Sequence, residues 1–222
     1  MQQLPLELAV RAPASLSNFV AGPNAEALGL MQALAAGERP ASPILLWGPA
    51  GSGKSHLIDA LPGARVLRPD DLPDDATLSD HELLTLDDIE NWNDAALDDL
   101  FLLLNRLRVL PRHVIVIGAC QPPAGLALRD DLRSRLAAGL VIALRTPSDG
   151  DREQALRRML AERGLADHDA VVHRLMTRHT RDIRYLAALV AALDSFALAR
   201  ARPLTGPLLR EFEQSGDLAR PD

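Results

Sequence analysis

The fold of this chain is decided by the stretch Gly48-Pro49-Ala50-Gly51-Ser52-Gly53-Lys54-Ser55. It fits the pattern G-x-x-x-x-G-K-[ST] at every constrained position, and it follows the short apolar run 44–47. Glycines in such a loop let backbone N–H groups turn inward around a phosphate, and a helix opening at Lys54 adds its dipole. Lys54 is the only lysine among the 24 basic residues. A compact ammonium suits phosphate oxygens, so the loop predicts nucleotide binding.

The phosphates would be held by this loop and by the helical turn behind it. We expect Lys54 to reach the β- and γ-phosphate oxygens and Ser55 to ligate Mg²⁺. The expected phosphate contacts are Pro49, Ala50, Gly51, Ser52, Gly53, Lys54, Ser55 and His56.

A second apolar run, 83–86, ends in two acidic residues, Asp87 and Asp88. A buried strand that delivers a carboxylate to Mg²⁺ is the usual partner of a phosphate loop, so we expect Asp87 to hold the metal. Asp88 stands where many ATPases of this type carry a glutamate that polarises water. Its shorter side chain would hold that water less well, and slow intrinsic hydrolysis is expected.

Short apolar runs alternate with helical segments through residue 147. The expected strands are 44–47, 65–67, 83–86, 113–118 and 140–144. Helices are expected over 24–36 with Asn24 as the cap, from 54 to about 61, over 94–108 and over 128–137, whereas the acidic residues 69–82 carry little pattern. Such alternation predicts an α/β fold with a parallel sheet and helices on both faces. After Pro147 only helical segments follow: 149–163, 168–179, 182–200 and 204–213.

The composition limits the class of protein. With 222 residues and 47% hydrophobic content the chain can bury a core, and its net charge of −6 argues against broad neutralisation of nucleic-acid phosphates. The single cysteine, Cys120, ends an apolar strand and is expected to be an inert buried thiol in a reducing compartment. There is no signal-peptide pattern, and no apolar run approaches the ~20 residues of a membrane helix. We expect a cytoplasmic protein that does not contact the membrane.

Three further segments resemble the AAA+ superfamily, and within it the clade of the initiator DnaA. Ser17–Asn24 is similar to the segment N-F-V-x-G-x-x-N that wraps the adenine, Asp131–Leu136 to the box D-L-x-S-R-L, and Arg181–Arg184 to the start of the lid helix. The motifs span residues 17–199. The resemblance implies a five-stranded parallel sheet of order 5-1-4-3-2 followed by a small all-helical lid. The implied domains are 16–147 for the α/β part and 148–222 for the lid.

The same resemblance assigns roles to individual residues. Phe19 and Val20 would contact the adenine of ADP or ATP, and Arg184 would be the sensor-two arginine. Arg135 would be an arginine finger that enters a neighbouring subunit's nucleotide site. The segment Gly118–Gln121 departs from the clade, which has a polar sensor-one side chain at this position. Together with Asp88, this departure favours binding of nucleotide over its hydrolysis.

Two departures from DnaA point to the Hda family of DnaA-homologous regulators. The sequence has no DNA-binding domain after the lid, and an acidic stretch, 68–82, replaces the insertion with which DnaA binds single-stranded DNA. At the start of the chain, residues 1–15 would form a flexible segment that carries the pattern Q-L-x-L-x-L, similar to the clamp-binding hexapeptide of that family. Gln3, Leu4, Leu6 and Leu8 would bind the clamp, because alternate leucines of an extended peptide face one way. From the residues alone, a leucine-rich tail without a partner is an equal alternative.

The resemblance therefore implies a regulator of replication initiation. It would bind ADP or ATP with Mg²⁺, attach to the β sliding clamp of DNA polymerase III, and stimulate ATP hydrolysis by DnaA in trans, preventing re-initiation. It would reach DNA only through these partners, and its own ATPase activity would be weak; a homodimer or higher homo-oligomer is left open. Two alternatives stay open as well. One is an autonomous AAA+ ATPase or helicase loader, and the other is a non-hydrolysing scaffold on the clamp.

Overall fold

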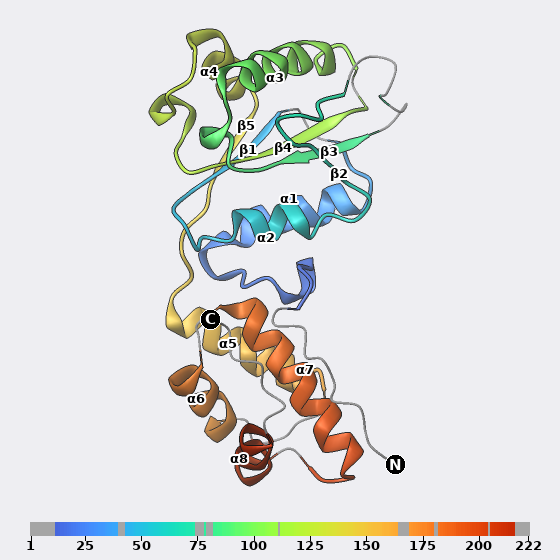
Figure 1. The fold of residues 1–222 in the computed structure, drawn as a ribbon, viewed down its shortest axis with the longest axis vertical. Helices are drawn as coiled ribbons and strands as arrows, with labels where there is room; N and C mark the ends of the chain where they lie inside the picture. Colours follow the sequence, from blue (N-terminus) through green and yellow to red (C-terminus); the bar gives the residue numbers. More distant parts are fainter. Residues whose placement is uncertain are drawn as a thin grey trace. The chain divides into compact units, whose positions relative to one another are not determined.

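The computed structural model describes residues 12–39, 43–73, 78, 82–110, 112–163, 169–179, 182–203 and 205–215. The chain forms two compact units, drawn in Figure 1. One is Ala21–Thr146, and in the other the residues before Ala21 join those from Pro147 onward. The two units divide between Thr146 and Pro147, and residues 16–20, expected in the α/β domain, group with the lid helices.

The α/β unit is built on a parallel sheet of five strands in the order β2-β3-β4-β1-β5. The predicted order 5-1-4-3-2 is the same sequence of strands counted from the other edge, so the predicted fold class is confirmed. The strands are β1 Ile44–Trp47, β2 Arg65–Val66, β3 Leu83–Leu86, β4 Val114–Ala119 and β5 Leu140–Ala143. Every residue of the central strand β4 is buried, which is why its sequence is apolar without alternation.

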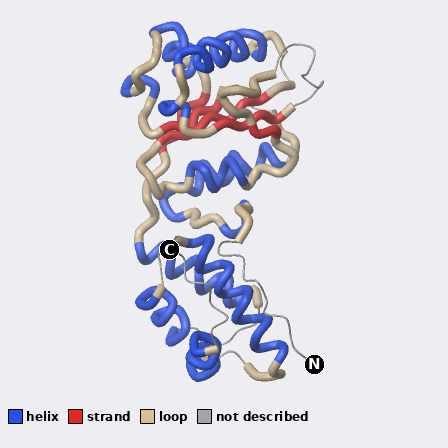
Figure 2. The backbone as a smooth tube through the Cα atoms, in the orientation of Figure 1, coloured by secondary structure: helices blue, strands red, loops and turns tan. Residues whose placement is uncertain are grey.

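Helices cover both faces of this sheet. Figure 2 shows one pair of helices on one face and the other pair on the opposite face. The first pair is α1 Ala25–Ala35 and α2 Lys54–Asp59, and the second is α3 Asp94–Leu107 and α4 Asp130–Ala137. Helix α3 turns five apolar residues inward: Ala96, Leu100, Leu103, Leu104 and Leu107. This spacing is that of a helix with one buried face.

The N-terminus of α1 differs from the expectation. Asn24 precedes the helix but its side chain makes no capping hydrogen bond. It is buried and turned instead toward Arg145, whose backbone N–H donates to Asn24 Oδ1 at 2.8 Å and whose carbonyl accepts from Nδ2 at 2.8 Å. The Nδ2 group also lies 3.4 Å from the carbonyl oxygen of Ser52. The predicted cap is therefore wrong, because a backbone partner 121 residues away in the sequence competes for the same amide.

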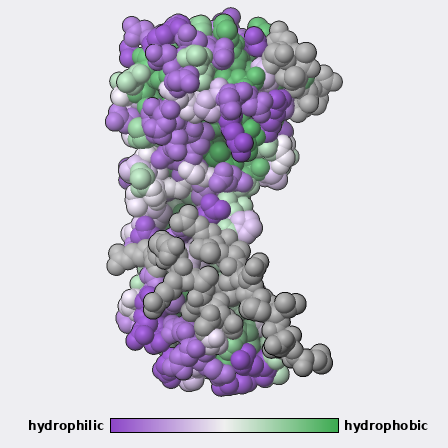
Figure 3. Space-filling view, viewed as in Figure 1, coloured by the Kyte–Doolittle hydropathy of each residue, from purple (hydrophilic) through white to green (hydrophobic). Residues whose placement is uncertain are grey.

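The second unit contains the four C-terminal helices, α5 Asp149–Ala161, α6 Asp169–Arg178, α7 Ile183–Ala199 and α8 Gly206–Gln214. Their buried faces form one apolar cluster, to which α7 contributes the largest share, with eight buried residues. Figure 3 shows hydrophilic side chains over much of the visible surface of these helices. In the part of the chain that the structure describes, no helix is both long and apolar enough to cross a membrane.

Candidate nucleotide site

The phosphate loop lies between β1 and α2, where the sequence motif predicted it. Gly51 and Gly53 have φ angles of +77° and +100°, a left-handed conformation that glycine adopts without steric cost. Lys54 opens α2 and is buried, with Nζ donating to the carbonyl oxygens of Gly48 at 2.8 Å and Pro49 at 3.3 Å. An ammonium has three N–H donors, so one remains for a phosphate oxygen.

The loop also holds a polar atom that lacks a partner. Ser52 is fully buried, and its Oγ makes no hydrogen bond to any described residue. A buried hydroxyl without a partner costs free energy unless a ligand or water satisfies it. Ser55, by contrast, has an exposed side chain on the first turn of α2. The loop's donors and hydroxyls therefore fit a phosphate with its Mg²⁺.

The predicted metal ligand, Asp87, follows β3 and lies against β4. The register pairs Leu86 with Ile117, which brings Asp87 beside Gly118. A Cβ atom on Gly118 would lie 1.7 Å from Asp87 Oδ1 and 2.9 Å from Ile58 Cδ1. The glycine that departs from the sensor-one pattern thus leaves the space that the Asp87 carboxylate occupies.

Asp88 adopts a left-handed backbone conformation that residues other than glycine rarely take. Its φ is +52°, and its N–H donates to Asp87 Oδ1 at 2.9 Å. Burial raises the pKa of the Asp88 carboxyl, the neighbouring charges of Asp87 and Glu90 raise it further, and the Lys54 ammonium lowers it. Strained residues of this kind cluster at functional sites. The electrostatics of Asp88 are therefore coupled to both the phosphate loop and the expected metal ligand.

Cys120 lies beyond the end of β4 and is exposed, so the prediction of a buried thiol is wrong. The strand ends at Ala119, and the chain bends away from the core directly after it. Partial desolvation nevertheless raises the pKa of the exposed Cys120 thiol, and the Glu90 carboxyl raises it further.

The sequence reasoning did not single out Glu90. This residue lies in the short 3₁₀ turn Ile89–Asn91, and its Oε2 is buried without a hydrogen-bond partner among the described residues. The sequence could have indicated Glu90, because it is the third acidic residue after β3 and follows Asp87 by three positions. Glu90 therefore adds a further negative charge near Asp88 and Cys120.

Helix α4 carries the arginine predicted to act as a finger. Two neighbouring arginines are paired: Arg129 binds Asp98 and Asp131, and Arg133 binds Asp130. In the described part of the chain Arg135 has no ion pair, and its Nε is buried without an acceptor. Its guanidinium is therefore the one in this helix that is not already neutralised by a carboxylate.

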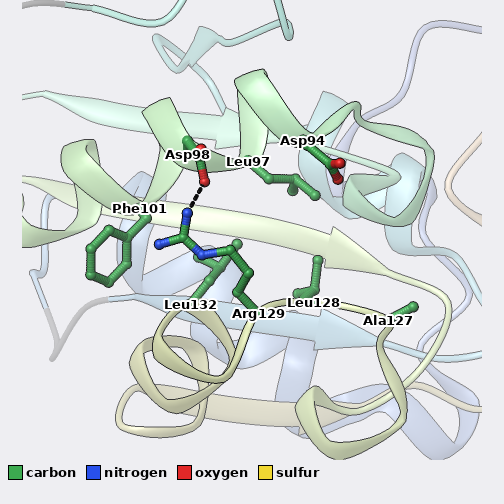
Figure 4. A pocket seen from close by; sticks show the side chains of 8 residues that line it. All are labelled: Asp94, Leu97, Asp98, Phe101, Ala127, Leu128, Arg129 and Leu132. Atoms are coloured by element: carbon green, nitrogen blue, oxygen red, sulfur yellow. Dashed lines mark hydrogen bonds and ion pairs between the residues drawn. The ribbon is translucent and has the colours of Figure 1, made fainter.

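A pocket lies beside the start of α4, between it and α3. It is lined by Asp94, Leu97, Asp98, Phe101, Ala127, Leu128, Arg129 and Leu132. Figure 4 shows the Arg129 guanidinium reaching across to Asp98, and its Cζ lies 5.8 Å from the centre of the Phe101 ring. These contacts fix the residue that precedes α4, and so the first turn of the helix that presents Arg135.

The remaining predicted site residues lie in several parts of the chain. His56 is buried on α2, whereas Phe19 and Val20 are buried in the unit of the lid helices. Arg184, at the start of α7, donates from Nε to the carbonyl oxygen of Ala12 at 3.2 Å. The predicted clamp-binding residues Gln3, Leu4, Leu6 and Leu8 lie outside the described residues.

Among the described residues, no group of three or more His, Cys, Asp or Glu side chains could hold a metal ion. Mg²⁺ that is bound with a nucleotide needs no such group, because one or two protein oxygens and the phosphates supply its ligands.

Comparison with known proteins places the lid helices in a defined family. Residues 149–212 match the family model described as the lid domain of Hda. These lid helices are Hda-like. An uncharacterized protein of Haemophilus influenzae is 27% identical over 227 residues, which cover 95% of this chain and 98% of that protein.

Solved structures of DnaA and RuvB are similar to this chain in fold. Domain III of DnaA from Thermotoga maritima has a TM-score of 0.63 at 22% identity, covering 91% of this chain and 96% of that domain. DnaA from Aquifex aeolicus bound to AMPPCP has a TM-score of 0.63 at 20% identity, covering 93% of this chain and 70% of that one. RuvB of Thermotoga maritima, a Holliday junction branch migration motor, has a TM-score of 0.59 at 20% identity, covering 93% and 72%. These likenesses show that the chain shares the fold of DnaA domain III and of RuvB.

Proposed function

We propose that this chain is a DnaA-related regulator of replication initiation that binds an adenine nucleotide with Mg²⁺ and stimulates ATP hydrolysis by DnaA in trans. The observation that carries the proposal is the phosphate loop with buried Lys54, set beside Asp87 in an AAA+ fold that continues into an Hda-type lid. The binding of AMPPCP by DnaA of Aquifex aeolicus supports an adenine nucleotide as the ligand.

Within the chain's own site, each residue has a binding role. Backbone N–H groups of the loop and the ammonium of Lys54 hold the β-phosphate, and Ser55 and Asp87 hold Mg²⁺, which neutralises phosphate charge when bound. Phe19 and Val20 contact the adenine, and Arg184 turns to the nucleotide as the sensor-two arginine. Asp88 is a short and strained substitute for a water-polarising glutamate. We propose that the bound nucleotide, ADP in the resting form, is structural and that intrinsic hydrolysis is slow.

The reaction that matters occurs in the partner's site. Arg135 enters the nucleotide site of ATP-bound DnaA and stabilises the negative charge that develops on the γ-phosphate in the transition state. The absence of an ion pair at Arg135 among the described residues supports this role, because an arginine without a carboxylate can approach an anion without first losing a partner. Such a finger raises the hydrolysis rate by roughly 10³–10⁵.

Binding to the sliding clamp through Gln3, Leu4, Leu6 and Leu8 would confine this activity to the period after replication has begun, when clamps are loaded on DNA. The clamp would bring the chain to DNA that it does not itself bind, in keeping with the net charge of −6. Cytoplasmic location follows from these partners.

The test is ATP hydrolysis by DnaA, measured with and without this chain and with and without DNA-loaded clamp. We expect stimulation only when all components are present, and its loss in Arg135→Ala. Arg133→Ala is the matched control, because Arg133 lies on the same helix but is paired with Asp130. Hydrolysis by the chain alone would favour an autonomous ATPase. Clamp binding without any effect on DnaA would favour a scaffold.

A further inference from the structure

Residues 12–20, which precede the α/β unit, pack on the lid helices. We name Ala12–Val20 the strap. Ala12 packs against the apolar cluster of the lid, while Phe19 and Val20 are 3% and 4% exposed. Within the strap, Ser15 and Asn18 form reciprocal side-chain to backbone hydrogen bonds, which makes the turn at Leu16–Asn18 a defined structure. The strap therefore belongs physically to the lid.

Two arginines of the lid hold the backbone of the strap. Arg158 of α5 points its Nη2 at the carbonyl oxygens of Ser17, at 3.3 Å, and Phe19, at 3.4 Å. Arg184 holds the other end, since its Nε donates to the carbonyl of Ala12 at 3.2 Å and its own carbonyl accepts from the Ala12 N–H at 3.0 Å. Both arginines thus donate to main-chain carbonyls of the strap.

The Arg158 contacts fall within the segment that is proposed to contact the base. Ser17 and Phe19 enclose Asn18 in the segment proposed to contact the base, and Phe19 is itself one of the proposed base contacts. Each terminal nitrogen of the planar guanidinium carries two N–H donors, so Nη2 of Arg158 can bind two carbonyls of the same turn. Arg158 therefore fixes the backbone from which the base-contacting side chains project.

We propose that Arg158 is a positioning residue for base recognition, which holds the base-contacting segment on the lid through the carbonyls of Ser17 and Phe19. This inference rests on the proposed function, in which Phe19 and Val20 contact the adenine. The partners of Arg158 among the described residues are strap carbonyls and Glu162, whose Oε1 lies 3.9 Å from Arg158 Nε, and none of them belongs to the phosphate loop. Loss of Arg158 therefore affects the recognition of the base and leaves the phosphate loop unchanged.

The experiment compares Arg158→Ala with Arg157→Ala, a matched control one residue away on the same helix. Arg157 binds Glu153 at 2.8 Å and Asp169 at 3.0 Å, and these partners lie in the lid helices outside the strap. Binding of ADP, GDP and inorganic pyrophosphate is measured for both variants and for the unaltered chain. Arg158→Lys is included, because a lysine retains the charge but not the planar fork.

For Arg158→Ala we expect the Kd for ADP to rise roughly three- to tenfold, as two partly exposed hydrogen bonds of this length allow. The preference for ADP over GDP should fall by a similar factor, and the affinity for pyrophosphate should not change. Arg158→Lys should recover part of the ADP affinity, and Arg157→Ala should behave as the unaltered chain. A variant that is merely destabilised would lose ADP and pyrophosphate binding together.

Equal ADP and GDP affinities in Arg158→Ala and Arg157→Ala would overturn the inference while leaving the proposed nucleotide site intact. Absence of ADP binding by the unaltered chain would overturn both. Should Arg158→Ala fail to fold, hydrogen exchange of the unaltered chain decides the question. ADP should then slow exchange at the amides of Asn18, Phe19 and Val20, and unchanged exchange there would refute the inference.

Discussion

Replacing Gly118 with alanine tests the centre of the candidate site directly. The added Cβ would lie 1.7 Å from Asp87 Oδ1 and 2.8 Å from Asp87 Cγ, whereas real Cβ contacts essentially never fall under 3.0 Å. The carboxylate must therefore move by more than about 1 Å, a displacement that can cost a site about 10²-fold in activity. Ile58 Cδ1, at 2.9 Å, is the end of a flexible side chain and can shift more easily.

Two measurements follow from this geometry. Strand β4 is buried along its whole length, so the added methyl should lower the free energy of unfolding by about 1–3 kcal/mol, as seen when well-packed cores are overfilled. Urea unfolding followed by circular dichroism measures this loss. Nucleotide binding, followed with a fluorescent adenine nucleotide in Mg²⁺ and in EDTA, should lose most of its dependence on Mg²⁺, because Asp87 no longer meets the metal.

Gly29→Ala is the control for this experiment. Gly29 lies on the exposed side of α1, and a Cβ there would meet no atom within 4 Å. Alanine at such a helical position should stabilise the chain by roughly 0.5–1 kcal/mol and leave Mg²⁺ dependence intact. If Gly118→Ala proved as stable as the unaltered chain and kept its full response to Mg²⁺, Asp87 would not be the metal ligand.

Three further predictions concern stability. Glu213 binds Arg174 through both oxygens; burial raises the pKa of Glu213, but this pairing outweighs burial and holds the pKa below its ordinary 4.5. The stabilisation that the pair contributes is present above pH 4.5 and is lost as the pH falls further. Glu213→Gln should therefore lower the free energy of unfolding by about 1–3 kcal/mol at pH 7 and flatten the acid branch of a pH–stability curve. Phe212→Ala should cost about 3–5 kcal/mol in urea unfolding, since Phe212 is 2% exposed and packs edge-on at 5.1 Å from Phe196. Asn24→Ala should cost about 1–3 kcal/mol and weaken nucleotide binding, since it removes the side-chain partner of the Arg145 backbone and of the buried Ser52 carbonyl in the phosphate loop, and an unchanged unfolding midpoint would contradict this.

The strands were predictable because each is a short apolar run bounded by residues that interrupt regular structure. β1 and β3 begin and end where the sequence predicted, since glycine follows the one and two aspartates the other. β4 was displaced by one residue, from 113–118 to Val114–Ala119. Helix ends were less well predicted: the helix expected from residue 128 begins at Asp130. End residues are chosen by local hydrogen bonds that compete with tertiary ones.

The errors have a common cause. Asn24 has the chemistry of a helix cap, but its amide bonds to the backbone of Arg145 across the unit. Cys120 has the environment of a buried strand in the sequence, but the strand ends one residue earlier. The partner of Asn24 lies 121 residues away, and the end of β4 is set by its pairing with β1. A local sequence pattern contains neither.

By itself, the sequence determined the phosphate loop, the order of strands and helices, and the change to an all-helical lid, because each depends on residue type and periodicity over a few neighbouring positions. Only the tertiary structure decided that Gly118 makes room for Asp87, that Arg135 alone of three arginines in its segment lacks a carboxylate among the described residues, and that Arg158 holds the strap. The physical reason is that these contacts depend on backbone carbonyls and on free space. Neither is encoded by the identity of a residue, and both arise only when distant segments meet.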